Sequence, residues 1–137
     1  MSAFLDPLVV MLSDPQANDH TGQWQIIKPL RYQSDLAGEV ITVPFGTSTD
    51  FSSVPRHSII AWGLFGGRAM RPAVLHDHLT RQRVYRREKC DNIFLEAMRA
   101  DGVPISRAMP MYLAVAAHTA SGLWKEDFDQ PGYEPIV

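Results

Sequence analysis

The sequence predicts an α+β protein in which a small N-terminal antiparallel sheet of about three strands precedes a helical hairpin and one further helix. Short apolar runs separated by turn residues fill the first part of the chain, and helical periodicity dominates from about residue 54. No internal repeat or linker separates the two parts. We therefore expect one domain over residues 1–137, with mainly strands over 1–50, mainly helices over 54–123 and an irregular tail over 124–137.

Three segments near the N-terminus have the pattern of strands. Segment 8–12 is a short apolar run, segment 24–32 roughly alternates apolar and polar residues, and segment 39–43 is a further run that ends before a proline. Asn, Asp, Ser and Gly fill the breaks between these segments, as they do in hairpin loops. Pro29 lacks a backbone N–H, so we expect its strand to lie at a sheet edge or at a bulge.

Helical patterns follow, and several begin at a residue suited to a helix start. Pro55 can open a short first helix with Ser52 or Ser53 as its cap. In the last helix, Pro110 is expected to disturb the first turns or to set the true start. The helices predicted after the first one run over 72–82, 87–100 and about 106–121.

Composition and charge exclude several classes of protein. The formal net charge is −2 and no run of Lys and Arg exceeds two residues, so the sequence lacks the footprint of nucleic-acid binding. The apolar run near the N-terminus is short and broken by Asp6-Pro7, so we expect neither a signal peptide nor a membrane span. Cys90 is the sole cysteine of the sequence and cannot form an internal disulfide, which favours assembly inside a cell.

The predicted helical hairpin brings two polar side chains together. Asp91 borders the apolar stripe of segment 87–100, so its carboxylate is at least partly desolvated and needs a charged or hydrogen-bonding partner. His76 lies beside the apolar positions of segment 72–82, and the short connection makes the two helices pack antiparallel. We therefore expect Asp91 to lie opposite His76.

This pair supports two interpretations. In the first, the Asp91 carboxylate fixes the imidazole tautomer, and the other ring nitrogen of His76 acts as a general base or metal ligand. Asp77 then faces the same cleft and holds a cation, while His78 points to the opposite side of the helix. In the second, His76 and Asp91 are a buried polar tie between helices, and Asp77 is a surface residue. The sequence alone favours neither.

The loop over residues 46–56 is a second candidate, because it is dense in oxygen donors and lies between the sheet and the helices. Asp50 can ligate a cation or pair with Arg56. The alternative is that Asp50 forms an Asx turn and that the neighbouring serines cap a helix. A nucleophilic Ser52 or Ser53 is disfavoured because no G-x-S-x-G motif is present.

Several segments between Trp24 and Trp124 carry a resemblance to a known family. They are Val43-Pro44, Thr49–Arg56, Ala73–Asp77, Asp91–Met98 and Met111-Tyr112. In their order and spacing, these segments resemble a family of small phage and prophage proteins of uncharacterised function. The resemblance implies phage origin, often among late structural or lysis genes, and little about mechanism. We expect a virion component that assembles in the host cytoplasm with other phage structural proteins as its partners.

A shorter resemblance involves Ala73–Asp77, Asp91 and Phe94. This pattern is similar to the active-site helix pair of secreted calcium-dependent phospholipases. The resemblance implies that His76 activates water, that Asp77 binds calcium and that Asp91 orients the histidine. It also implies that calcium-binding carbonyls come from three glycines, Gly63, Gly66 and Gly67.

The chain departs from the phospholipase pattern in three ways. Thr80 occupies the position where that family usually has tyrosine, the disulfides of the family are absent, and the glycines lie closer to the histidine. The motif therefore supports a His-Asp hydrolase site more than it supports lipid as the substrate.

Two functions follow as expectations. The first is a virion protein of the tail or baseplate type with a metal-assisted, hydrolase-like site directed at the host cell envelope. His76 and Asp91 are its catalytic residues, and Asp77 and Asp50 are ligands for a divalent cation, with calcium a better candidate than zinc. The alternative is a purely structural or assembly protein in which His76 and Asp91 form the polar tie.

Overall fold

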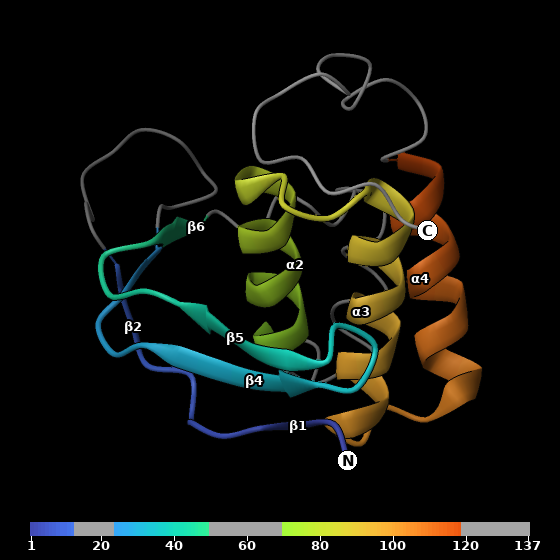
Figure 1. Cartoon of the computed structure of the whole chain (residues 1–137), viewed down its shortest axis with the longest axis horizontal. Coiled ribbons are helices and arrows are strands. Elements are labelled where there is room, and N and C mark those ends of the chain that lie inside the picture. The colour runs from blue at the N-terminus through green and yellow to red at the C-terminus, as the bar shows by residue number, and fades with distance from the viewer. Residues whose placement is uncertain (13–23, 50–69, 119–137) are drawn as a thin grey trace.

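The computed structural model describes residues 1–12, 24–49 and 70–118, which form antiparallel strands followed by helices (Figure 1). The predicted α+β class is confirmed. The predicted short helix at Pro55 and the tail over 124–137 lie outside the described residues. The strands of the described part are β1 (Ala3–Phe4), β2 (Val10–Leu12), β3 (Trp24–Ile26), β4 (Leu30–Ser34), β5 (Glu39–Val43) and β6 (Ser48–Thr49), and its helices are α2 (Met70–Gln82), α3 (Arg87–Ala100) and α4 (Ile105–His118).

The described strands form two three-stranded antiparallel sheets, with the orders β1-β4-β5 and β2-β3-β6. The longest pairing joins β4 and β5, and it runs from Leu30 opposite Val43 to Ser34 opposite Glu39. The two-residue strands β1 and β6 add one edge to each sheet. They are too short to produce an alternating pattern, and the sequence did not predict them.

The prediction of one strand over 24–32 is wrong. β3 ends at Ile26, β4 begins at Leu30, and the two strands belong to different sheets. Pro29 lies in the connection between them, outside either strand. A proline has no N–H to give to a ladder, so the connection accommodates it without the loss of a hydrogen bond.

The sheet that contains β4 and β5 packs against the helices through alternate residues. Leu30, Tyr32 and Ser34 are buried, whereas Arg31 and Gln33 between them are exposed, as the two-residue period of a strand requires. α3 contacts β4, and α2 contacts β5. The main core cluster, between the sheets and these two helices, consists of Ile26, Leu30, Tyr32, Ile41, Val43, Val74, Leu75, Leu79, Tyr85, Cys90, Ile93 and Ala97.

Helix α3 lies between α2 and α4 and packs against both (Figure 1). Its bounds are those predicted, and the chain leaves the helix through Gly102, whose φ of 88° is in the left-handed region that favours glycine. In the described residues α2 covers Met70–Gln82, so the helix includes residues ahead of the predicted start at Pro72. A second core cluster joins α3 to α4, and it consists of Ala73, Phe94, Met98, Val103, Ala108, Met111 and Val115.

Helix α4 continues through Pro110, so this proline does not set the start of the helix. In a regular helix the N–H at this position would bond the carbonyl of Ser106. Pro110 and Ser106 are both exposed, so water can satisfy that carbonyl. This placement explains why the helix tolerates an interior proline.

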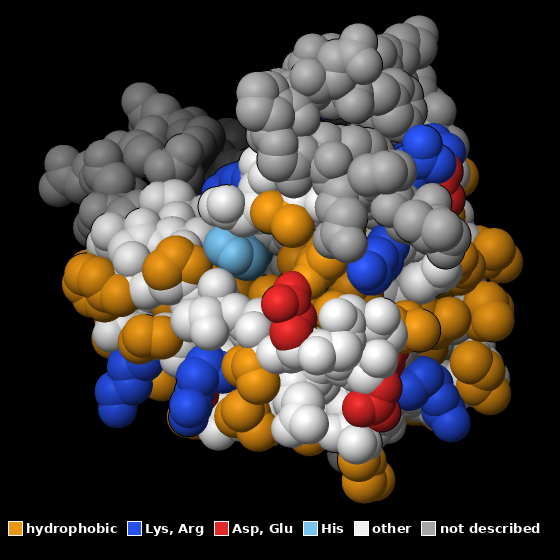
Figure 2. All heavy atoms as spheres, in the orientation of Figure 1, with side chains coloured by type: hydrophobic (Ala, Val, Ile, Leu, Met, Phe, Trp, Pro, Cys, Tyr) orange, Lys and Arg blue, Asp and Glu red, His pale blue; other side chains and the backbone are white. Residues whose placement is uncertain are grey.

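The face in Figure 2 carries hydrophobic side chains scattered among polar and charged ones. Within the described residues, no helix has both the length and the apolar character needed to cross a membrane.

Candidate functional site

The predicted contact between His76 and Asp91 is present. His76 lies on α2, Asp91 lies on α3, and Nε2 of the imidazole is 2.7 Å from Oδ1 of the carboxylate. The two side chains are only 1% and 4% exposed. The pair therefore joins the two helices of the hairpin inside the protein.

The geometry assigns different roles to the two ring nitrogens of His76. A carboxylate only accepts hydrogen bonds, so a neutral imidazole beside Asp91 donates its Nε2–H. Nδ1 then carries the lone pair, and it can accept a proton or bind a cation. This is the arrangement that a histidine general base requires, because the carboxylate also stabilises the imidazolium once a proton is taken up.

Phe94 forms a wall beside the imidazole. The ring centroids of His76 and Phe94 are 5.1 Å apart, and the ring planes are tilted by 47°. Phe94 is 1% exposed and follows Asp91 on the same helix by almost one turn. α3 therefore supplies both the hydrogen-bond acceptor for His76 and an apolar surface against its ring.

Asp77 is buried at 6% exposure, so the interpretation of Asp77 as a surface residue is wrong. Its Oδ2 lies 3.2 Å from a guanidinium nitrogen of Arg81, one turn further along α2. Arg81 also donates a hydrogen bond to the carbonyl of Ser48 in β6. Asp77 and Arg81 thus connect α2 to the second sheet, and a cation bound by Asp77 would compete with the guanidinium.

Of the two predicted metal ligands, Asp77 belongs to the described residues and Asp50 does not. The described residues contain no group of three or more His, Cys, Asp or Glu side chains arranged to hold a metal ion. Asp50, Arg56 and the glycines of the predicted calcium loop lie outside the described residues. Asp77 as a calcium ligand and Asp50 as a second ligand therefore stay predictions.

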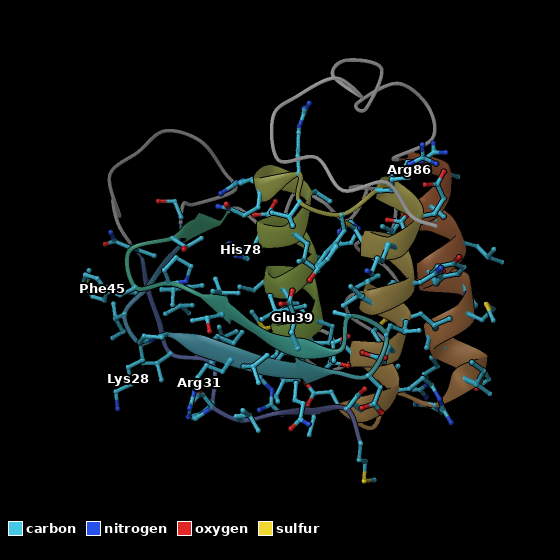
Figure 3. All side chains as sticks on the ribbon, in the orientation of Figure 1. Lys28, Arg31, Glu39, Phe45, His78 and Arg86 are labelled. Carbon is cyan, nitrogen blue, oxygen red and sulfur yellow. The ribbon has the colours of Figure 1, made fainter. Side chains whose placement is uncertain are left out.

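Two further titratable side chains flank the pair in sequence. His78 is half-buried on α2 (Figure 3), and burial lowers its pKa, with Asp77 opposing and Arg81 reinforcing that shift. Burial raises the pKa of the Cys90 thiol to about 12, and the charge of Asp91 adds to the effect. The thiol is therefore protonated at neutral pH, and a buried protonated thiol is a poor nucleophile.

Sequence reasoning missed Glu96, which links α3 to the first sheet. Its Oε1 accepts hydrogen bonds from Tyr32 Oη at 2.7 Å and Ser34 Oγ at 2.8 Å, and its Oε2 accepts one from the Leu36 N–H at 2.9 Å. The sequence did contain a sign that such a partner exists. Tyr32 and Ser34 lie on the buried face of β4, and buried hydroxyl groups need hydrogen-bond partners. Glu96 holds the β4–β5 hairpin on α3, close in sequence to Asp91.

Comparison with known proteins shows that most of the chain matches one family. A family model described as a protein of unknown function (DUF1353) matches residues 24–115, a segment that includes His76, Asp77, Asp91 and Glu96. The "Uncharacterized protein y4jT" of Sinorhizobium fredii (strain NBRC 101917 / NGR234) is 37% identical over 78 residues, which cover 56% of this chain and 23% of that protein. The chain thus spans less than a quarter of that relative's length. No solved structure matches.

Proposed function

The chain belongs to the DUF1353 family of proteins of unknown function, and we propose that it carries a hydrolase site in which His76 is the general base and Asp91 its orienting partner. The observation that carries this proposal is the 2.7 Å contact between Nε2 of His76 and Oδ1 of Asp91, made by two buried side chains on different helices. A buried charge-assisted hydrogen bond of this kind fixes the tautomer of an imidazole and restrains the ring nitrogen that makes it.

The proposed step is hydrolysis of an ester or amide. Nδ1 of His76 takes a proton from water while the water oxygen forms a bond to the carbonyl carbon. Asp91 stabilises the resulting imidazolium through the Nε2–H hydrogen bond. When the tetrahedral intermediate collapses, the bond to the leaving oxygen or nitrogen breaks, and the proton passes from Nδ1 to that leaving group.

A divalent cation is the second part of the proposal. Asp77 is the ligand for it, and calcium fits a carboxylate better than zinc does. Asp77 already pairs with Arg81, so the cation must displace that guanidinium or share the carboxylate with it. The acid–base step above depends on His76 and Asp91, and the cation would add polarisation of the substrate oxygen.

We further propose that the protein acts in a phage particle, in the tail or baseplate, on the host cell envelope. The support is the sequence resemblance over segments from Trp24 to Trp124, among them Ala73–Asp77 and Asp91–Met98. Mass spectrometry of purified particles from a phage that encodes this chain tests the location. The chain should be present in a fixed number of copies per particle, and its absence from washed particles would contradict a virion role.

A structural function is the second candidate, and one observation favours it. The His76 side chain is 1% exposed, and a polar tie between two helices needs no access to solvent. In that case His76 and Asp91 contribute to the uniqueness of the helix packing and perform no chemistry.

Hydrolysis assays with matched variants separate the two functions. The probes are a chromogenic carboxylic ester, phospholipid vesicles and purified peptidoglycan, each with and without calcium. His76→Gln should lower the rate by about 100-fold or more, the usual contribution of a general base. His78→Gln is the control, because it changes a half-buried histidine of the same helix that has no part in the proposed step. A folded wild-type protein that hydrolyses none of the three probes supports the structural function instead.

A further inference from the structure

Phe94 has a place in the site that the proposed step does not use. We propose that Phe94 is a positioning residue: its ring sets the plane of the His76 imidazole so that Nε2 meets Asp91 and Nδ1 keeps one direction. The inference deepens the proposed function and rests on it for its catalytic meaning. The physical statement, that one aromatic contact orders one histidine ring, can be tested without any substrate.

A single hydrogen bond does not hold an imidazole plane. The torsion that turns a histidine ring is broad and roughly two-fold, unlike the staggered torsions of aliphatic chains. The Asp91 carboxylate restrains one ring atom, Nε2, and it can rotate with that atom as the ring turns. A second contact on the face or edge of the ring is needed to fix its plane.

Phe94 provides that second contact. Its ring centroid lies 5.1 Å from that of His76 at a tilt of 47°, which is within the range of favourable aromatic pairs. Both side chains are 1% exposed, so water does not replace the contact when the imidazole turns. The two restraints come from the same helix, with Asp91 holding one ring nitrogen and Phe94 the ring plane.

The position of Phe94 is itself fixed by α4. Phe94 belongs to the second core cluster, in which Met111 and Val115 of α4 pack with Met98 of α3. These side chains are all buried, and a close-packed cluster leaves an aromatic ring few alternative rotamers. The proposal therefore gives α4 a role in the site: it holds the wall against which His76 is ordered.

The test compares Phe94→Leu with a matched variant on the same helix. Leucine keeps an apolar side chain at the position but removes the planar ring. Ile93→Val is the control, because Ile93 is fully buried in the other core cluster and the change removes one methylene group. Long-range ¹H–¹⁵N correlation spectra of the full chain report the tautomer of His76, and the exchange rate of its Nε2 proton with solvent reports the order of the ring.

In the wild type and Ile93→Val, we expect one Nε2–H tautomer and a slowly exchanging ring proton. In Phe94→Leu the signals of the two tautomers should begin to average. The Nε2 proton should exchange about tenfold faster, because loss of an aromatic contact of this kind raises the population of the turned ring by about that factor. Amide shifts away from the site must stay in place, which shows that the fold is retained. Unchanged tautomer and exchange in Phe94→Leu would overturn the positioning role, as would equal changes in Ile93→Val.

This outcome is distinguishable from failure of the proposed function. If Phe94 orders the ring but no probe is hydrolysed, the positioning contact stands as a property of a structural pair. If hydrolysis depends on His76 while Phe94→Leu leaves the ring ordered, the general base stands and the positioning role falls.

Discussion

Nε2 of His76 and Oδ1 of Asp91 lie 2.7 Å apart across the α2–α3 hairpin, in a place where both side chains are almost fully removed from solvent. Burial removes both side chains from water, and the hydrogen bond between them compensates for part of that loss. Together they form a contact on which both the packing of two helices and the proposed chemistry depend.

Asp91→Ala should destabilise the protein by about 3 kcal/mol or more, because it leaves the buried imidazole without its acceptor. Urea unfolding measures the change. Glu88→Ala is the control on the same helix, because the Glu88 carboxylate is exposed and pairs at the surface with Arg87. That change should cost less than about 1 kcal/mol. Equal, small losses in the two variants would contradict a buried tie at Asp91.

The cation at Asp77 can be tested through its competition with Arg81. Calcium should raise the Tm of the wild type, since a ligand that binds only the folded state stabilises it. Asp77→Asn should abolish the rise. Arg81→Gln should shift the response to lower calcium concentrations, because it removes the guanidinium that lies 3.2 Å from the carboxylate. If neither calcium nor zinc changes the Tm of the wild type or of Arg81→Gln, Asp77 is not a metal ligand.

Glu96 should prove as important to the fold as the candidate site. Glu96→Ala removes the acceptor of three hydrogen bonds from the β4–β5 hairpin, and we expect a loss of about 2 kcal/mol or more. Tyr32→Phe removes only one of the donors and should cost about 1 kcal/mol. Denaturant unfolding gives both values, and amide exchange at Leu36 should accelerate in Glu96→Ala but little in Tyr32→Phe. A loss of stability in Glu96→Ala no larger than in Tyr32→Phe would show that the other two hydrogen bonds of Glu96 contribute nothing to the stability of the fold.

His78 should make the protein sensitive to mild acid. Burial lowers its pKa in the folded state, so the unfolded chain binds the proton more tightly. The stability contributed by neutral His78 is therefore present above the unfolded pKa of about 6.5 and is lost as the pH falls below it. His78→Gln should flatten the fall in the free energy of unfolding below about pH 6.5. A slope that is the same in both proteins would show that another group causes it.

The helical part of the fold was predictable because its signals are local. The apolar stripe of Cys90, Ile93, Phe94, Ala97 and Met98 follows the helical period along α3, and the helix bounds of α3 followed from it. The break between β3 and β4 was not predictable in the same way. Apolar residues recur at two-residue spacing on both sides of Pro29, at Trp24 and Ile26 and again at Leu30 and Tyr32. The pairing of each half with a different partner shows that there are two strands.

In the candidate site, too, the contacts between residues close in sequence were predictable and the long-range contacts were not. The contact of His76 with Asp91 was predictable, because a short connection and two helical periods place the residues opposite each other. The link from Glu96 to Tyr32 was not, because it joins residues 64 positions apart whose proximity depends on how the sheet packs on α3. The ion pair of Asp77 with Arg81 has ordinary helical spacing, and a helix wheel alone could have suggested it.

The sequence distances of these contacts also set an order of folding. His76 and Asp91 are 15 residues apart, whereas the Glu96 contacts close segments of 60 to 64 residues. Closing a longer loop costs more chain entropy before any contact rewards it. The α2–α3 hairpin should therefore be structured in the folding transition state, with the β4–β5 hairpin docking afterwards. Changes at Asp91 should slow folding, and changes at Glu96 should mainly speed unfolding.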